Sequence, residues 1–218
     1  MAWQIDRRWM GGVAAIAMLV ACSKPVPNTG SAEGAPTKNA SAATATPALS
    51  VAVTEASFRC LRDMTPVRDF FVDNLLGDLD ATVAVAESPT GGTYPLGSLV
   101  QVIPTTAMVK HPPGYSPATN DWEFIELDVK ADGVTILGRG FAELNMRSGP
   151  NCLGCHKPAK AAWDLICDRS HDCIPIPLTP ITLRALQNTD PRCPKIELPQ
   201  DQIDALAALA ATPPVDKP

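Results

Sequence analysis

The segment Cys152-Leu153-Gly154-Cys155-His156 has the clearest chemical meaning in this chain. Its pattern, C-x-x-C-H, is the attachment site of a c-type haem. In such a site the two thiols add to the vinyl groups of the porphyrin, and the histidine becomes the proximal iron ligand. We therefore expect one covalently bound haem c, held by Cys152 and Cys155, with His156 as the axial ligand of its iron.

The first 22 residues have the pattern of a bacterial export signal. Such a signal directs a protein to the compartment where haem c is assembled. Arginines at positions 7 and 8 precede an apolar run at 12–20, too short to span a bilayer of about 30 Å comfortably. The run ends in Leu19-Val20-Ala21-Cys22, which resembles the lipobox cut by lipoprotein signal peptidase. This resemblance implies that Cys22 becomes the first mature residue and carries lipid, and several acyl chains together anchor a protein stably. Because Ser23 rather than aspartate follows, we expect a periplasm-facing lipoprotein of the bacterial outer membrane.

Composition divides the remaining chain into three parts. Residues 23–50 are rich in Ala, Ser, Thr and Pro and cannot bury enough apolar surface to fold, so we expect a disordered tether. Residues 51–199 are long enough for one domain with its own core, and this would be the haem-binding domain. Residues 200–218 would form a C-terminal helix and tail. The net charge of -5 argues against nucleic acid as a partner.

Periodicity in the domain predicts an α+β fold, with a mainly antiparallel sheet, a few short helices and the haem near the C-terminal part. A helix is expected from Thr65 to Gly77, since its apolar residues recur at helical spacing. Further helices are expected at 157–166 and 200–211. Strands are expected, on alternation and turn signals, at 82–86, 99–103, 122–129, 134–137 and 141–146.

The cysteines that remain form an even set. Of the seven in the chain, Cys22, Cys152 and Cys155 are assigned above, which leaves Cys60, Cys167, Cys173 and Cys193. Disulfides persist in an oxidising compartment, and four cysteines allow three pairings. We favour Cys167 with Cys173, which closes a small loop, and Cys60 with Cys193, which ties the ends of the domain together.

A family resemblance extends over about residues 65–170. The matching segments are Tyr94-Pro95-Leu96-Gly97-Ser98-Leu99-Val100, Asp121-Trp122-Glu123-Phe124, and Cys152 to His156 with Ala159, Trp163, Asp164 and Leu165. In this order they resemble the cytochrome P-460 and cytochrome c-prime-beta group. The resemblance implies an antiparallel sheet with short helices, usually a homodimer, and a five-coordinate iron with an open distal face. Members oxidise hydroxylamine or bind small gases such as nitric oxide. Class I cytochromes c fit less well, because no methionine follows His156.

One departure from this family concerns activity. Its catalytically active members cross-link a lysine to the haem from the strand that begins with the Gly-Ser pair. That strand has no lysine here, and Lys110 comes several residues too late to be in register. Whether the chain is a haem oxidoreductase therefore stays open.

The sixth iron ligand decides between two functions. The chain has three histidines, and His171, inside the expected Cys167–Cys173 loop, is a candidate for that position. His111 precedes two prolines and is interpreted as a loop residue, while Met64, Met108 and Met146 are interpreted as core residues. A filled position would suit electron transfer with redox partner proteins, and an empty one would suit binding of small gases or other ligands.

Other readings of the same residues stay open. Cys152, Cys155, His156, His171 and Cys173 include enough nitrogen and sulfur ligands for zinc, although the spacing does not form two ribbon-like pairs. Cys152 and Cys155 would also suit a thiol–disulfide exchanger, but no βαβ pattern surrounds them. A disulfide-stapled binding lipoprotein without haem is the last alternative.

Overall fold

The structure is a computed structural model that describes residues 50–146, 151–169, 171–176 and 178–212. All of these residues fall within one compact unit, residues 45–218. The expected signal segment, the lipidation site at Cys22 and the tether up to residue 49 lie outside the described residues.

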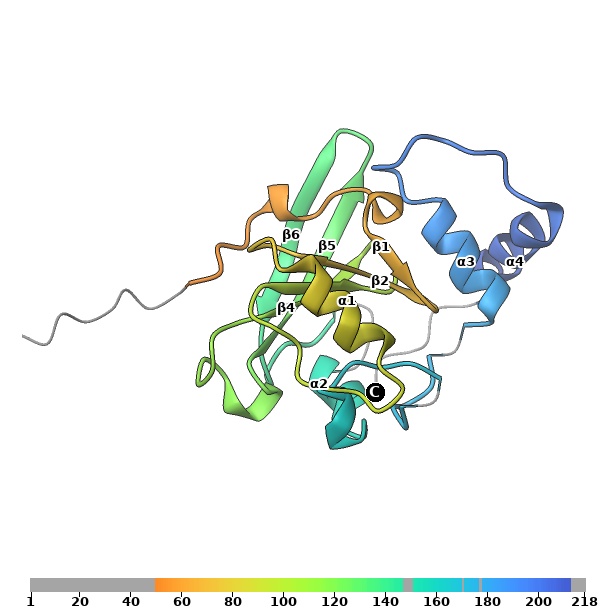
Figure 1. The fold of residues 1–218 in the computed structure, drawn as a ribbon. Coiled ribbons are helices and arrows are strands. Elements are labelled where there is room, and N and C mark those ends of the chain that lie inside the picture. Colours follow the sequence, from red (N-terminus) through yellow and green to blue (C-terminus); the bar gives the residue numbers. More distant parts are fainter. Residues whose placement is uncertain (1–49, 147–150, 170, 177, 213–218) are drawn as a thin grey trace, which may run out of the picture. The chain divides into compact units, whose positions relative to one another are not determined.

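Six antiparallel strands form one sheet in which each strand pairs with the next along the chain (Figure 1). The strands are β1 (Thr65–Val67), β2 (Phe70–Asn74), β3 (Ser98–Gln101), β4 (Thr106–Lys110), β5 (Trp122–Lys130) and β6 (Gly133–Gly140). The α-helices of the described residues are α1 (Leu79–Glu87), α2 (Cys152–His156), α3 (Pro180–Asn188) and α4 (Gln200–Ala210). The expected antiparallel sheet with short helices is confirmed.

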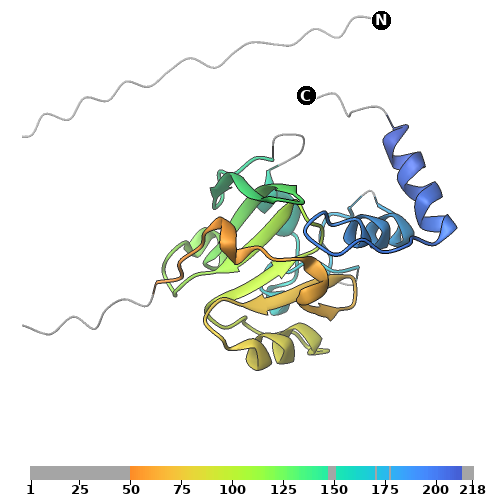
Figure 2. The same ribbon diagram turned by 90° about the horizontal axis from the view of Figure 1, so that it is seen from above.

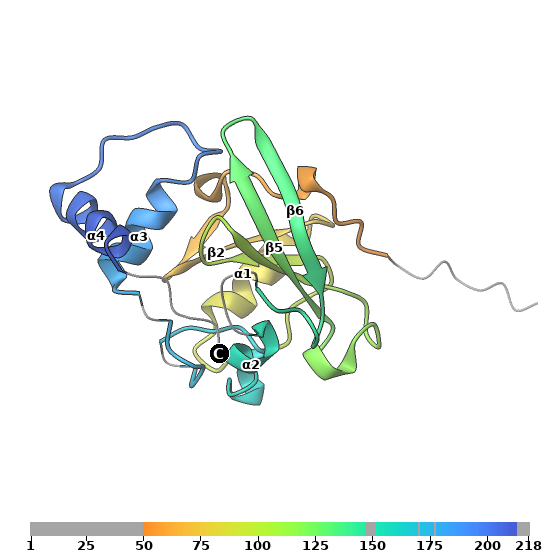
Figure 3. The same ribbon diagram turned by 180° about the vertical axis from the view of Figure 1, so that it is seen from behind.

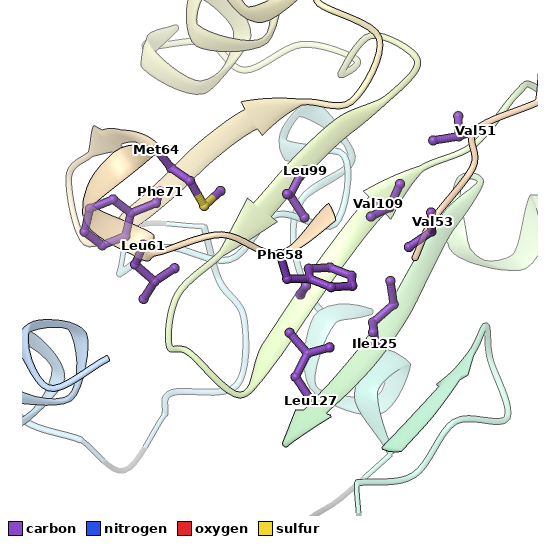
Figure 4. Close-up of a cluster of buried hydrophobic side chains, with 11 residues drawn as sticks. Val51, Val53, Phe58, Leu61, Met64, Phe71, Leu99, Val109, Ile125 and Leu127 are labelled. Atoms are coloured by element: carbon purple, nitrogen blue, oxygen red, sulfur yellow. The ribbon is translucent and has the colours of Figure 1, made fainter. Parts of the chain in front are cut away.

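The segment before the sheet closes one of its faces. Residues 51–64, which we call the strap, cross this face with short 3₁₀ turns at Glu55–Ser57 and Leu61–Asp63. Apolar side chains of the strap and of the sheet interdigitate there (Figure 4). The buried cluster consists of Val51, Val53, Phe58, Leu61, Met64, Phe71, Leu99, Ala107, Val109, Ile125 and Leu127. Their burial removes a large apolar surface from water, which is the main source of folding free energy.

The opposite face is covered by α1 and by the segment that carries the C-x-x-C-H motif. Alternate residues of the same strands point to this side, since successive side chains of a strand face opposite sides of a sheet. They form a second buried cluster that includes Val72, Val100, Met108, Trp122 and Phe124. Cys152 and Leu153 of α2 pack against this cluster. In the views of Figures 1 and 3, α2 lies below the strands.

The strongest strand predictions are confirmed. β5 and β6 form the expected hairpin around the turn at 131–132, with Lys130 opposite Gly133 and a bulge between Glu126 and Leu127. β3 lies where a strand was expected at 99–103. The C-terminal helix is also confirmed, as α4, and packs against α3 to one side of the sheet (Figure 2).

The expected helix from Thr65 to Gly77 is wrong, because this segment forms β1 and β2. Phe70, Phe71 and Val72 are all buried, since β2 has the strap on one face and the second cluster on the other. A strand buried on both faces shows a continuous apolar run instead of alternation. The helical spacing of its apolar residues was therefore coincidental.

The expected strand at 82–86 is also wrong, because these residues belong to α1. Thr82 and Ala86, four residues apart, are the buried positions of this helix, and the Thr82 hydroxyl donates to the Asp78 carbonyl at 3.0 Å. The β-branched residues Thr82, Val83 and Val85 suggested a strand, but packing against the sheet decides the conformation here.

Two expectations near the motif need correction, and three elements were missed. Residues 141–146 form turns with one bridge from Asn145 to Asn151 instead of a strand, and the segment 157–166 contains only a 3₁₀ turn at Ala161–Trp163 instead of a helix. The missed strand is β4, and the missed helices are α2 and α3. In α3, Thr179 caps the first turn by accepting from the Thr182 N–H at 3.1 Å.

Candidate haem-attachment site

The short helix α2 is held in place by the residue before it. Asn151 caps the helix, since its Oδ1 accepts a hydrogen bond from the Gly154 N–H at 2.9 Å. Its Nδ2 donates to the carbonyls of Ala142 and Leu144 at 2.8 and 3.1 Å. An asparagine in front of a helical segment is a recognised start signal, so this residue was available to sequence reasoning and was missed.

The two cysteines of the motif are free and half-buried. Both Cys152 and Cys155 line a cavity under the sheet. Burial is the main cause that raises the pKa of the Cys152 thiol to about 11, with smaller contributions from the neighbouring Cys155 and Glu126. A thiol with such a pKa is protonated at neutral pH, whereas thiol–disulfide exchange requires a thiolate. Cys152 is therefore poorly suited to be the nucleophile of an exchanger.

His156 is oriented by a backbone carbonyl. Its Nδ1 lies 2.7 Å from the Leu165 oxygen, which can only accept, so Nδ1 carries the proton and donates. Burial lowers the pKa of the ring, and the bond to Leu165 opposes this only in part. The neutral ring therefore has an unprotonated Nε2, the form in which histidine binds metals. Sequence reasoning found His156 but missed Leu165, because a backbone acceptor has no sequence signature.

The cavity beside His156 has a volume of about 330 Å³. One wall is the second face of the sheet, and the other is the C-x-x-C-H segment with the residues that follow it. Val100, Met108 and Phe124 contribute apolar surface, and the ring of Phe124 lies 5.2 Å from that of His156. Glu126 brings a carboxyl group to the same wall. Mostly apolar walls with a few polar groups are typical of cofactor sites.

The structure does not bring the other two histidines to this cavity. The ring of His171 is buried and stacks on Trp163 at 3.9 Å, and its Nδ1 donates to the Ile166 carbonyl at 2.8 Å. His111 is also buried, at 2.8 Å from Glu123. Met108 and Met146, by contrast, do line the cavity. Met108 also belongs to the second buried cluster, so the core role expected for it is confirmed.

Lys110 does not line the cavity, and its side chain contacts other residues. Its Nζ lies 2.7 Å from the Asp164 carboxylate and donates to the Asn120 carbonyl at 2.6 Å. None of the described residues that line the cavity is a lysine. The cross-linking lysine of active cytochrome P-460 proteins therefore has no counterpart among these residues.

Both disulfides of the structure are the pairs favoured from the sequence. Cys60 joins Cys193, and Cys167 joins Cys173. The second pair borders the site, since Cys167 lines the cavity and its Sγ lies 3.3 Å from Nδ1 of His156. Cys173 is thereby removed from the set of zinc ligands. Within the described ranges, no three His, Cys, Asp or Glu residues come together to hold a metal ion.

No helix in the described part of the chain is both long and apolar enough to cross a membrane. Comparison with known proteins gave no match: no protein-family model, no curated protein and no solved structure is significantly similar to this chain.

Proposed function

We propose that this protein is a lipid-anchored c-type cytochrome with one covalent haem, facing the periplasm, whose iron binds a small ligand. The observation that supports this most is the arrangement around His156. Two free thiols and an imidazole with an available Nε2 lie on one short helix, at the edge of a largely apolar cavity.

The residues present fit a haem c by their chemistry. Cys152 and Cys155 would hold the porphyrin through thioether bonds, and His156 would ligate the iron. A haem bound there supplies a redox-active iron with a coordination position for a ligand such as nitric oxide or carbon monoxide. The Leu165 carbonyl orients the imidazole of His156, and mostly apolar side chains line the cavity beside it.

Small-ligand binding is favoured by the positions of the other histidines. His171 and His111 are each buried in contacts away from the cavity, so neither is in place to fill the sixth position. The resemblance to cytochrome P-460 and cytochrome c-prime-beta agrees with an open iron face. Hydroxylamine oxidation is not part of the proposal, since no described cavity residue is a lysine.

Electron transfer is the second candidate, and the cavity wall gives a specific reason for it. Met108 and Met146 both lie there, and a thioether in the sixth position raises the potential of a haem and suits electron transfer. Such a protein would exchange electrons with redox partner proteins. A homodimer, as the resemblance implies, is compatible with either function.

A carbon monoxide difference spectrum of the reduced, haem-loaded protein tests the proposal. We expect rapid formation of a carbon monoxide complex, because the iron would have a vacant face. A red protein that does not bind carbon monoxide would favour electron transfer, and Met108→Ala and Met146→Ala would then show which thioether blocks the iron. A colourless protein from a host with working cytochrome c maturation would refute both candidates.

The membrane anchor is tested separately, because it concerns residues at the start of the chain. Metabolic labelling with a fatty acid should mark the wild-type protein, and Cys22→Ala should abolish the label and release the protein from the membrane fraction. A labelled Cys22→Ala variant would contradict the proposed lipidation site.

A further inference from the structure

The hydrogen bond between His156 and Leu165 depends on a segment with a strained backbone. Asp164 and Leu165 follow the 3₁₀ turn at Ala161–Trp163, and their φ angles are 49° and 64°. Non-glycine residues in the left-handed region cost free energy and persist where the surrounding structure holds them in place. The position of the Leu165 carbonyl therefore depends on the contacts that fix Asp164.

Four hydrogen bonds from earlier parts of the chain fix Asp164. Its Oδ2 accepts from Lys110 Nζ at 2.7 Å and from the Tyr94 N–H at 3.0 Å, and its Oδ1 accepts from Asn120 Nδ2 at 3.2 Å. Its backbone oxygen accepts from Trp122 Nε1 at 2.7 Å. Lys110 ends β4 and Trp122 begins β5, so the sheet itself holds this turn.

The ion pair at the centre of this network is almost completely buried. The side chains of Lys110 and Asp164 are 7% and 6% exposed, and Lys110 also lies 5.0 Å above the ring of Trp122. Burying two charges is costly, and the cost is offset only where geometry and further hydrogen bonds are good. A hydrophobic pair of the same volume would often serve stability equally well, so stability alone does not explain these two residues.

We propose that Lys110 and Asp164 are positioning residues for the proximal histidine. By holding the turn at Asp164 and Leu165, the pair sets the direction and strength of the hydrogen bond that His156 donates. Such a bond fixes the ring orientation of a metal-bound histidine and increases its basicity, and so tunes the metal. This inference rests on the proposed function, since it requires His156 to ligate a haem iron.

The test compares holoprotein variants by two properties of the haem. In Lys110→Met and Asp164→Asn, the Leu165 carbonyl is held less firmly and the imidazole donates less electron density to the iron. We expect the midpoint potential to shift upward in both variants. If the ferrous iron is five-coordinate, we also expect the iron–histidine stretching band to move to lower wavenumber and to broaden. If the iron is six-coordinate, the midpoint potential alone reports the change at His156.

Asp190→Asn is the matched control. Asp190 is also buried, pairs with Arg192 at 2.8 Å, and accepts a hydrogen bond from the Leu61 N–H at 2.9 Å, so it supports the strap. This variant should lose stability while the midpoint potential stays at the wild-type value.

Trp122→Phe provides a milder change of the network, because it keeps an aromatic ring and the ion pair but removes the donor to the Asp164 backbone. It should shift the potential upward by a smaller amount.

The outcomes separate the two proposals. Loaded, folded Lys110→Met and Asp164→Asn with wild-type potentials would overturn the inference and leave the proposed function standing. An equal shift in Asp190→Asn would also overturn it, because the effect would then follow general destabilisation. If the two charge variants do not fold, Trp122→Phe decides, and an unchanged potential there refutes the inference. A wild-type protein without haem would refute the proposed function and this inference with it.

Discussion

The two faces of the sheet are built from the same strands but are completed in different ways. The strap closes one face with side chains of the chain itself, and eleven buried residues fill it. The other face is covered by α1 and the C-x-x-C-H segment, and a cavity of about 330 Å³ remains beside His156. Protein interiors are normally packed with few large voids. The chain itself therefore fills the first face, whereas the second face retains the cavity to which the proposed haem is assigned.

Each face also has its own disulfide. Cys60–Cys193 anchors the strap and spans a sequence separation of 133 residues, whereas Cys167–Cys173 borders the cavity and spans 6. In the chain-entropy description a long loop gives the larger stabilisation, of about 5 kcal/mol against about 2 kcal/mol for the short one. The strap disulfide therefore serves stability, while the short disulfide lies where it can influence His156.

The largest expected effect follows from removing the strap disulfide. The variant Cys60→Ala/Cys193→Ala should lose about 5 kcal/mol of unfolding free energy, measured by urea denaturation. The variant Cys167→Ala/Cys173→Ala should lose only about 2 kcal/mol, but should change the haem spectrum and potential. Equal losses of unfolding free energy in the two double variants, together with identical haem spectra, would contradict the different roles proposed for the two disulfides.

Neighbouring residues of β3 offer a finer comparison. Leu99 points into the closed face and is 0% exposed, whereas Val100 lines the cavity and is 6% exposed. Leu99→Ala leaves a void in a filled core and should cost about 2 to 5 kcal/mol. Val100→Ala only enlarges an existing cavity and should cost about 1 to 2 kcal/mol. Urea denaturation of both variants under one condition measures the difference, and a larger loss for Val100→Ala would contradict the assignment of the faces.

Enlarging the same two side chains, instead of truncating them, gives a second comparison of the two faces. Leu99→Phe overpacks the closed face and should cost about 1 to 3 kcal/mol. Val100→Phe places a ring in open space, so the fold should tolerate it with a smaller loss. It should, however, reduce haem incorporation, measured as the ratio of haem absorbance to protein. Full haem incorporation in Val100→Phe would indicate that this part of the cavity is not used.

The smallest effect concerns pH and the closed face. Burial raises the pKa of Glu123, but hydrogen bonds from His111 and Arg139 outweigh it and hold the pKa below its ordinary value of 4.5. A carboxyl with a lowered folded-state pKa contributes stability above its unfolded-state pKa, and this contribution is lost as pH falls through the folded value. We expect unfolding free energy to fall as pH decreases below about 4.5, and to fall less steeply in Glu123→Gln. Urea denaturation at a series of pH values measures the unfolding free energy of both proteins. The same pH dependence in wild type and Glu123→Gln would refute the role of Glu123.

Sequence reasoning succeeded where the signal was local. The hairpin of β5 and β6 was predictable because a turn separates two β-rich segments, and the disulfide pairs followed from an even set of cysteines in one small loop and at two domain ends. The motif residues Cys152, Cys155 and His156 were identified from spacing alone, and they lie together on one cavity. These features need little knowledge of tertiary structure.

Sequence reasoning failed where distant contacts decide. β2 is buried on both faces and lacked alternation, so tertiary packing overrode its helical spacing. The lysine at position 110 was considered only as a cross-linking candidate, because its partner Asp164 lies 54 residues away. The carbonyl of Leu165 and the wall position of Met146 have no signature in the sequence.

The most direct test of this account is the intact mass of the mature protein, produced in a host with working cytochrome c maturation. We expect the mass of the lipidated polypeptide plus one haem, and expect the addition to disappear in Cys152→Ser/Cys155→Ser. A wild-type mass equal to the polypeptide and its lipid alone would contradict the central claim that Cys152 and Cys155 bind a haem covalently.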